Sequence, residues 1–405
     1  MDVVFVVPYA METTLRFARR TAELAGVRLG VISQEPGEVL VRELGGRMQA
    51  FERVDDALDP DQLQRATRAI ASHFGGKVER LLGVLEQLQE PLAQVRERMQ
   101  IRGMDLAEAR NFRDKSRMKD VLRAADVPCA RHHLCKNKDE AFAFAREILP
   151  LVAKPPAGAG ARNTQRLDTR EQLAAWMQSF PPTDEQPLLL EEFVQGQEHS
   201  FDSVMLHGKL VWSSISEYTP GPLAVMENPW IQWCVVLPRH VDGDRYDAIR
   251  GQGKRALEAL GMFTGLSHME WFRRGDGSIA ISEVGARPPG AQFTTLLSFA
   301  HDVDFYRAWS ELMVFETFTP PRRNWAVGAV FLRGHGGGRV NRVHGVDAVK
   351  QELGELVVQA RIPRPGQPKS ESYEGEGFVI VRHEDTEVVR TALNRVLELV
   401  QVEMA

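Results

Sequence analysis

Two glutamates in one short segment are spaced so that together they could hold a cation. Asp276-Gly277 stands between two strand-forming runs and predicts a β-hairpin, because both residues tolerate the positive φ angles of a type I′ turn. With these two residues as the loop, Glu270 falls directly opposite Glu283. Facing carboxylates repel each other, so such a pair indicates a cation, a shared proton or solvent on that face.

The same face of the hairpin carries two further polar groups. Side chains alternate along a strand, which places His268 and Arg287 on the side of the two glutamates. Carboxylate oxygens are ligands that Mg²⁺ prefers, and an arginine beside them suits an anion such as phosphate. The pattern predicts a metal site for phosphate chemistry. The alternative is a solvated hairpin whose polar residues share a face by coincidence.

A lysine followed by small residues gives a second candidate for phosphate binding. Lys154 ends an expected strand over 151–154, and the loop 155–163 contains Gly158 and Gly160. Small residues let backbone N–H groups approach phosphate oxygens, and an ammonium group meets phosphates as a point charge. Only ten of the 50 basic residues are lysines. The alternative is an ordinary glycine-rich turn.

Carboxylates also gather at the end of a third expected strand. The apolar run at 188–190 leads into Glu191, Glu192 and Val194, and Glu198 follows. A strand end of this kind can offer backbone groups to a base edge and a carboxylate to ribose hydroxyls. The alternative is an ordinary strand end with solvated acids.

The elements that must position these groups alternate between strand and helix. A strand at 3–7, a helix at 12–25 and a strand at 27–33 predict a small parallel α/β domain at the start of the chain. Pro8 and Tyr9 stand where a dinucleotide-binding glycine motif would follow the first strand, so that function is not supported. Shifts in composition divide the chain at about 1–104, 105–320 and 321–405.

Composition narrows the class of protein. The 405 residues carry a net charge of −5, which argues against an electrostatic nucleic-acid binder. Three cysteines cannot build a disulfide framework. We find no leader sequence and no apolar run near the ~20 residues that a membrane helix needs. We therefore expect a cytoplasmic protein that binds neither nucleic acid nor membrane.

In this order and spacing, five motifs resemble the ATP-grasp superfamily over essentially the whole chain. They lie at 111–128, 152–163, 190–198, 265–270 and 281–288. The resemblance implies an α/β (α+β) protein with the ATP-grasp fold. Residues 1–104 would form a Rossmann-like pre-ATP-grasp domain and 105–320 the ATP-grasp domain, with a mobile lid at about 128–192. Residues 321–405 would form a small C-terminal α+β domain.

The resemblance also implies roles for individual residues. Lys115 and Lys154 would neutralise the α- and β-phosphates of ATP, while the loop with Gly158 and Gly160 closes over the γ-phosphate. The adenine would lie against Glu191, Glu192 and Val194, and the ribose against Glu198. The metal ligands would be Glu270 and Glu283, holding Mg²⁺ or Mn²⁺. The groups near the reacting atoms would be Arg287, His268 and Glu217.

Two departures from the family pattern concern the phosphate end. Gly285 stands where the family often has an asparagine that supplies a metal-site oxygen. The loop has Ala161-Arg162-Asn163-Thr164 where a serine is common. Both leave open whether catalysis is weakened.

The motifs are most similar to carboxylate–amine ligases, including L-amino acid (dipeptide) ligases, with biotin carboxylase as a near neighbour. Such ligases form an amide through an acyl phosphate and release ADP and phosphate. This implies a small carboxylate and a small amine as substrates, neither identified by the sequence, and a homodimer, since dimers are common among similar proteins. Two alternatives are a biotin-carboxylase-like enzyme that activates bicarbonate and a non-catalytic ATP-binding protein.

Overall fold

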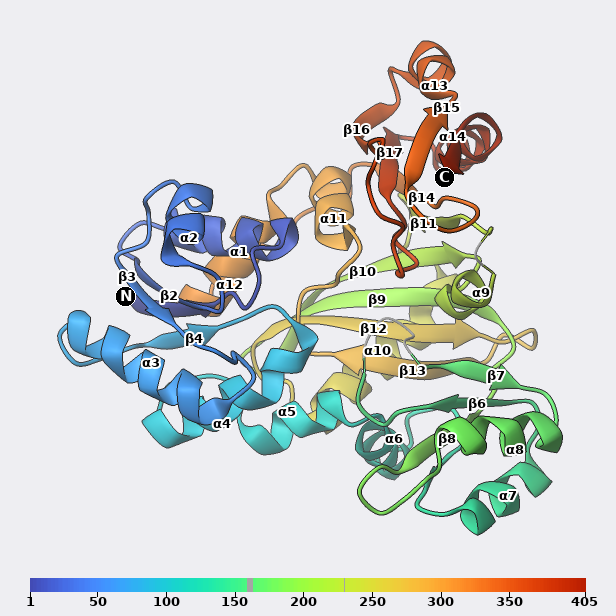
Figure 1. Ribbon diagram of the computed structural model, residues 1–405, viewed down its shortest axis with the longest axis horizontal. Coiled ribbons are helices and arrows are strands. Elements are labelled where there is room, and N and C mark those ends of the chain that lie inside the picture. Colours follow the sequence, from blue (N-terminus) through green and yellow to red (C-terminus); the bar gives the residue numbers. More distant parts are fainter. Residues whose placement is uncertain (159–162, 229) are drawn as a thin grey trace.

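The computed structural model describes residues 1–158, 163–228 and 230–405, and in these residues the strands form four sheets (Figure 1). The first is a parallel sheet in the order β3-β2-β1-β4. Its strands are β1 (Asp2–Val6), β2 (Arg28–Ser33), β3 (Ala50–Arg53) and β4 (Arg80–Leu82). The helices around it are α1 (Glu12–Ala22), α2 (Gly37–Glu43), α3 (Pro60–His73) and α4 (Gln89–Met99), with a short 3-10 helix η1 (Glu86–Leu88). The parallel α/β opening expected from the alternation is therefore confirmed.

A small antiparallel sheet, which we call the lid sheet, follows two connecting helices. The helices are α5 (Leu106–Arg113) and α6 (Lys115–Ala124). The strands are β5 (His132–Cys135), β6 (Leu151–Lys154), β7 (Gln165–Leu167) and β8 (Leu188–Glu192), in the order β5-β8-β6-β7. Its helices, α7 (Lys138–Glu147) and α8 (Arg170–Ser179), contribute their apolar faces to a core shared with these strands.

The largest sheet is antiparallel and has the order β13-β12-β9-β10-β11-β14-β17-β16. Its strands are β9 (Gln197–Leu206), β10 (Lys209–Thr219), β11 (Trp233–Leu237), β12 (Gly265–Arg273), β13 (Ile279–Gly285), β14 (Ala326–Leu332), β16 (Val357–Arg361) and β17 (Gly377–His383). Because β11 pairs with β14, strands from both sides of the expected boundary at residue 320 share one sheet.

The remaining elements cover this sheet and its edges. They are α9 (Pro222–Glu227), η2 (Asp244–Tyr246), α10 (Asp247–Leu260), α11 (Phe293–His301), α12 (Phe305–Phe315), α13 (Val346–Leu353), α14 (Thr386–Leu399) and a strand pair of β15 (Val340–His344) with β18 (Gln401–Met404). Within the part of the chain that the structure covers, no helix is long and apolar enough to cross a membrane.

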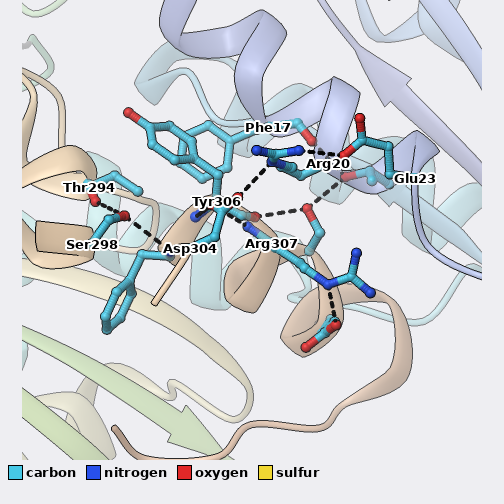
Figure 2. Close-up of polar contacts among 12 residues, drawn as sticks. Phe17, Arg20, Glu23, Thr294, Ser298, Asp304, Tyr306 and Arg307 are labelled. Atoms are coloured by element: carbon cyan, nitrogen blue, oxygen red, sulfur yellow. Dashed lines mark hydrogen bonds and ion pairs between the residues drawn. The ribbon is translucent and has the colours of Figure 1, made fainter. Parts of the chain in front are cut away.

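Helix α12 packs against α1 and so connects the N-terminal sheet to the rest of the molecule. Figure 2 shows Arg20 between Glu23 and Asp304, and its Nε lies 2.6 Å from Asp304 Oδ2. The rings of Phe17 and Tyr306 pack beside this ion pair, with centroids 4.7 Å apart. These contacts fix the position of α1, whose first turn borders the cleft described below.

Replacing Asp304 with alanine is expected to lower the free energy of unfolding by about 1–2 kcal/mol. Asp304 caps α12 by accepting from the backbone N–H groups of Tyr306 and Arg307, and caps contribute about that much. The partly exposed pair with Arg20 adds less than ~1 kcal/mol. Urea denaturation measures the change, with Asp59→Ala, which removes the cap of α3 alone, for comparison. An unchanged unfolding midpoint would contradict this role of Asp304.

The buried His199 should make the protein sensitive to acid. Its ring is fully buried and stacks on Trp271, with centroids 4.4 Å apart, and burial lowers its pKa to about 4. Below pH ~6.5 the unfolded chain binds a proton that the folded chain excludes, so the stability falls as the pH is lowered. We expect His199→Phe to remove about 1–2 kcal/mol of the loss between pH 7 and pH 5. Denaturation curves for both proteins at the two pH values test this. If the variant and the wild type lose the same free energy of unfolding between pH 7 and pH 5, the prediction is refuted.

Candidate active site

One cleft of about 1430 Å³ collects most of the residues singled out above. Its walls come from the start of α1, η1, the lid sheet, strands β12 and β13, and a loop of the C-terminal segment. The predicted site residues that line it are Lys115, Lys154, Gly158, Glu191, Glu192, Val194, Glu198, His268, Glu270, Glu283 and Arg287. These residues are spread over more than 170 positions of the chain, so their convergence is a property of the fold.

The two glutamates of the hairpin face each other as predicted, although the turn differs. Glu270 pairs with Glu283 in the register of β12 and β13. The predicted two-residue turn is wrong: Arg274 N donates to Ser278 O at 2.8 Å, which leaves a three-residue loop with Gly277 at φ +84°. This loop shifts the register by one residue, and an irregularity after Glu270 shifts it back.

Three carboxylates crowd this end of the cleft. Burial, together with the negative charge of Glu270, raises the pKa of Glu198 well above its usual value. Glu283 behaves oppositely: although burial raises its pKa, the charges of Lys115 and Lys154 outweigh burial and lower it to about 2. The neutral form of Glu198 is therefore favoured, whereas the nearby lysines keep Glu283 ionised.

The lysines connect this acidic pair to the lid sheet. Lys115 Nζ lies 2.9 Å from Glu283 Oε1 and donates to Gly158 O at 3.0 Å. Lys154 Nζ lies 2.9 Å from the buried Glu191 Oε1. Burial lowers the pKa of Lys154, but the charges of Glu191 and Glu283 raise it by a larger amount, so its ammonium form is favoured. Two positive charges thus flank the cleft between the lid sheet and the hairpin.

A third lysine was not predicted as a site residue. Lys119 is fully buried, and its Nζ lies 3.1 Å from Glu191 Oε1 and donates to the carbonyl of Ser282. It therefore ties β8 of the lid sheet to β13 beside Glu283. Its position four residues after Lys115, one helical turn along the same helix face, was the signal in the sequence.

His268 is fixed by a buried carboxylate on the neighbouring strand. Its Nδ1 lies 2.6 Å from Asp202 Oδ1, and its Nε2 lies 3.3 Å from the hydroxyl of Tyr218. Burial lowers the pKa of His268, but Asp202 and Glu270 outweigh burial and raise it to about 9. His268 therefore stands in the cleft as an oriented positive charge.

Arg287 is oriented by an acid from the N-terminal segment. Its Nε donates to Glu86, and its Nη1 donates to the carbonyl of Pro288 at 2.9 Å. Glu86 also accepts from Arg113 Nη1 at 3.0 Å. No local pattern marks Glu86 in the sequence, because its role depends on how η1 packs against the end of β13.

One predicted residue that the structure describes does not line the cleft. Glu217 lies outside its lining and is paired elsewhere: it binds the side chain of Arg390 and accepts from Tyr246 at 2.8 Å. Its neighbour Tyr218 lines the cleft instead, because successive residues of a strand point to opposite faces. Gly160 lies outside the described residues. Of two tryptophans in the irregular stretch before β11 and at its start, Trp233 lines the cleft, whereas Trp230 is not part of its lining and is 59% exposed.

The donor set around Glu270 and Glu283 fits Mg²⁺ that arrives with a nucleotide. In the ranges that the structure covers, no group of three or more His, Cys, Asp and Glu side chains is arranged to hold a metal on its own. Mg²⁺ in nucleotide sites is typically bound by one or two carboxylates together with phosphate oxygens and water. Two adjacent carboxylates therefore suit such an ion better than an all-protein cage would.

Comparisons with known proteins agree with the motifs. No family model matches the sequence. The L-arginine-specific L-amino acid ligase of Bacillus subtilis is 25% identical over 209 residues, which are 50% of this chain and 49% of that protein. The chain thus spans about half the length of this curated relative.

Solved structures match over the whole chain. The L-amino acid ligase from Bacillus licheniformis superposes with a TM-score of 0.78 at 18% identity, covering 100% of this chain and 98% of that one. The biotin carboxylase domain of the Hydrogenobacter thermophilus 2-oxoglutarate carboxylase, a dimer solved with MgADP, ADP and bicarbonate, gives 0.68 at 16% identity, with 99% and 90% covered. The chain therefore has the ATP-grasp fold, and its resemblance to the ATP-grasp carboxylate–amine ligases is confirmed.

Proposed function

We propose that this protein is an ATP-dependent carboxylate–amine ligase that forms an amide or peptide bond and releases ADP and phosphate. The observation that carries the proposal is the cleft in which Lys115, Lys154 and Arg287 surround the facing pair Glu270 and Glu283. The similarity to L-amino acid ligases favours amino acids or similar small carboxylates as substrates.

The protein's own groups would act mainly by charge and position. Lys115 and Lys154 would bind the phosphates of ATP, with Glu191, Glu192 and Val194 toward the base and Glu198 toward the ribose. Glu270 and Glu283 would hold Mg²⁺, which when bound neutralises phosphate charge. Arg287, already oriented by Glu86, would face the transferring phosphoryl group or the substrate carboxylate. Positioning and charge neutralisation supply most of the catalysis of phosphoryl transfer.

The proposed reaction has two steps. A carboxylate oxygen of the first substrate attacks the γ-phosphorus, the bond to the β-phosphate oxygen breaks, and ADP leaves. The amine then attacks the carbonyl carbon of the acyl phosphate, and the C–O bond to phosphate breaks as the amide forms. Closure of the lid sheet over the cleft would keep water from the acyl phosphate. We also propose that the protein is cytoplasmic and forms a homodimer.

The test is a screen of amino-acid pairs with Mg·ATP in which ADP and the mass of the product are measured together. We expect ADP release that depends on both substrates, with an amide product of matching mass. Release of AMP would exclude an acyl-phosphate route. ADP formation that requires bicarbonate and biotin would select the biotin-carboxylase-like alternative, and ATP binding without ADP release across the screen would select a non-catalytic role.

A further inference from the structure

The C-terminal segment sends one loop into the cleft, at a place that no motif marks. In this loop, residues 370–376, Tyr373 and Glu374 line the cleft beside Ala291, on the stretch that follows Arg287. The nucleotide end of the cleft, with Lys115 and Lys154, is built from other elements. The loop therefore borders the part of the cleft left for the substrates.

The loop is joined to the end of β14 by hydrogen bonds and close packing. Glu376 is 1% exposed and accepts from the backbone N–H groups of Ser370 and Gly334, each at 2.7 Å. Gly375 has φ +61°, and a Cβ added there would lie 2.2 Å from the carbonyl oxygen of Leu332. Only glycine fits this position. The side chains that precede it are therefore presented to the cleft in a fixed arrangement.

Tyr373 is anchored by packing and coupled electrostatically to the site. Its ring meets Trp233 edge-on, with centroids 4.6 Å apart. Burial raises the pKa of Tyr373, and the charges of Glu374 and Glu270 add to the effect, so the phenol keeps its proton and can donate a hydrogen bond. Its phenol and the guanidinium of Arg287 both belong to residues that line the cleft, and each group affects the pKa of the other.

Glu374 lines the cleft without a positive partner among the described side chains, unlike three acids that border the nucleotide end and Arg287. Glu86, Glu191 and Glu283 each form an ion pair with an arginine or lysine. In the described part of the chain, no basic side chain lies within 4 Å of the Glu374 carboxylate. Burial raises the pKa of Glu374, against weaker lowering by Arg361 and by the backbone N–H of Ala291. A half-buried carboxylate of this kind is suited to a ligand that brings its own positive charge.

We propose that Glu374, with Tyr373 beside it, forms the subsite for the amine substrate. The ammonium group of this substrate binds the Glu374 carboxylate and gives it one proton, which frees the nitrogen lone pair. The neutral amine attacks the acyl phosphate held beside Arg287, the C–O bond to phosphate breaks, and the second proton leaves with the phosphate. Glu374 then returns its proton to solvent. This inference rests on the proposed ligase function.

Hydroxylamine allows formation of the acyl phosphate to be measured separately from formation of the amide. It is small and largely uncharged at neutral pH, so it can trap the acyl phosphate as a hydroxamate without needing an ammonium subsite. We expect Glu374→Gln to slow amide formation roughly 100-fold or more, a typical size for loss of a general base, while ATP-dependent hydroxamate formation stays within about threefold of the wild type. Tyr373→Phe should slow amide formation about tenfold and leave hydroxamate formation close to the wild-type rate. Glu355→Gln, a change at an exposed acid of the same segment, is the control and should leave both rates unchanged.

The outcomes keep the two ideas distinct. If the wild type forms no hydroxamate with any carboxylate, the proposed ligase function fails and the subsite fails with it. If hydroxamate forms and Glu374→Gln still makes amide at the wild-type rate, the subsite alone is overturned. Loss of both products in a folded Glu374→Gln protein would place Glu374 in carboxylate activation and would also overturn it. Should that variant not fold, the Tyr373→Phe result decides in the same way.

Discussion

Replacing Glu283 with glutamine is expected to abolish ADP formation, a loss of roughly a thousandfold or more. Glu283 faces Glu270 across the hairpin, and Lys115 Nζ lies 2.9 Å from its carboxylate. Glutamine keeps the size of the side chain but removes the negative charge that a phosphate-bound cation requires. The remaining carboxylate of Glu270 would have to hold the cation alone.

The fold should survive this change. Glutamine removes the charge that pairs with Lys115, which lowers the stability, but it also relieves the crowding of negative charge with Glu198, and Lys115 keeps its hydrogen bond to Gly158 O at 3.0 Å. The measurements are ADP release at saturating Mg·ATP and the thermal midpoint without nucleotide, with Glu355→Gln as the control. A cooperative melting transition, at a midpoint somewhat below that of the wild type, with no ADP release is the expected result. Turnover at the wild-type rate would refute the assignment of Glu283 to the metal site.

The candidate site was largely predictable because its motifs are local. Lys115, Lys154 and the hairpin glutamates each stand in a short segment whose spacing indicates chemistry, and the fold brings these segments to one cleft. The pairing of Glu270 with Glu283 followed from counting outward from the turn. That count succeeded only because two shifts of one residue cancel, one in the loop and one at the irregularity after Glu270.

The rest depends on packing that no short segment encodes. Glu217 was expected near the substrate, but its strand is largely buried on both faces, so the sequence does not indicate which face borders the cleft. The structure turns Tyr218 to the cleft and Glu217 to Arg390. Glu86 and Glu374 reach the cleft from the N-terminal and C-terminal segments, and only the arrangement of the sheets brings them there. The sequence therefore indicates the chemistry of single motifs better than the contacts between distant ones.

Lys154→Ala is expected to have an effect as large as the change at Glu283, through the nucleotide itself. Lys154 ends β6 with its ammonium group in the cleft, 2.9 Å from Glu191 and influenced by the charges of Glu283 and Glu270. A buried ammonium group whose charge is favoured by its surroundings is a strong partner for phosphate. Removing it should abolish ADP formation, a loss of roughly a thousandfold or more, and should weaken ATP binding.

The stability of Lys154→Ala shows whether the variant is inactive because it no longer binds phosphate or because it does not fold. Glu191 would remain buried but would keep its contact with Lys119 Nζ at 3.1 Å, so it is not left without a counter-charge. We therefore expect the free energy of unfolding to fall by only about 1–3 kcal/mol. Thermal melting with and without Mg·ATP reports both effects: the variant should melt cooperatively but gain no stabilisation from the nucleotide. Lys138→Ala, at an exposed lysine of the lid region, should keep that stabilisation. If Lys154→Ala is stabilised by Mg·ATP like the wild type and releases ADP, Lys154 does not bind the phosphates.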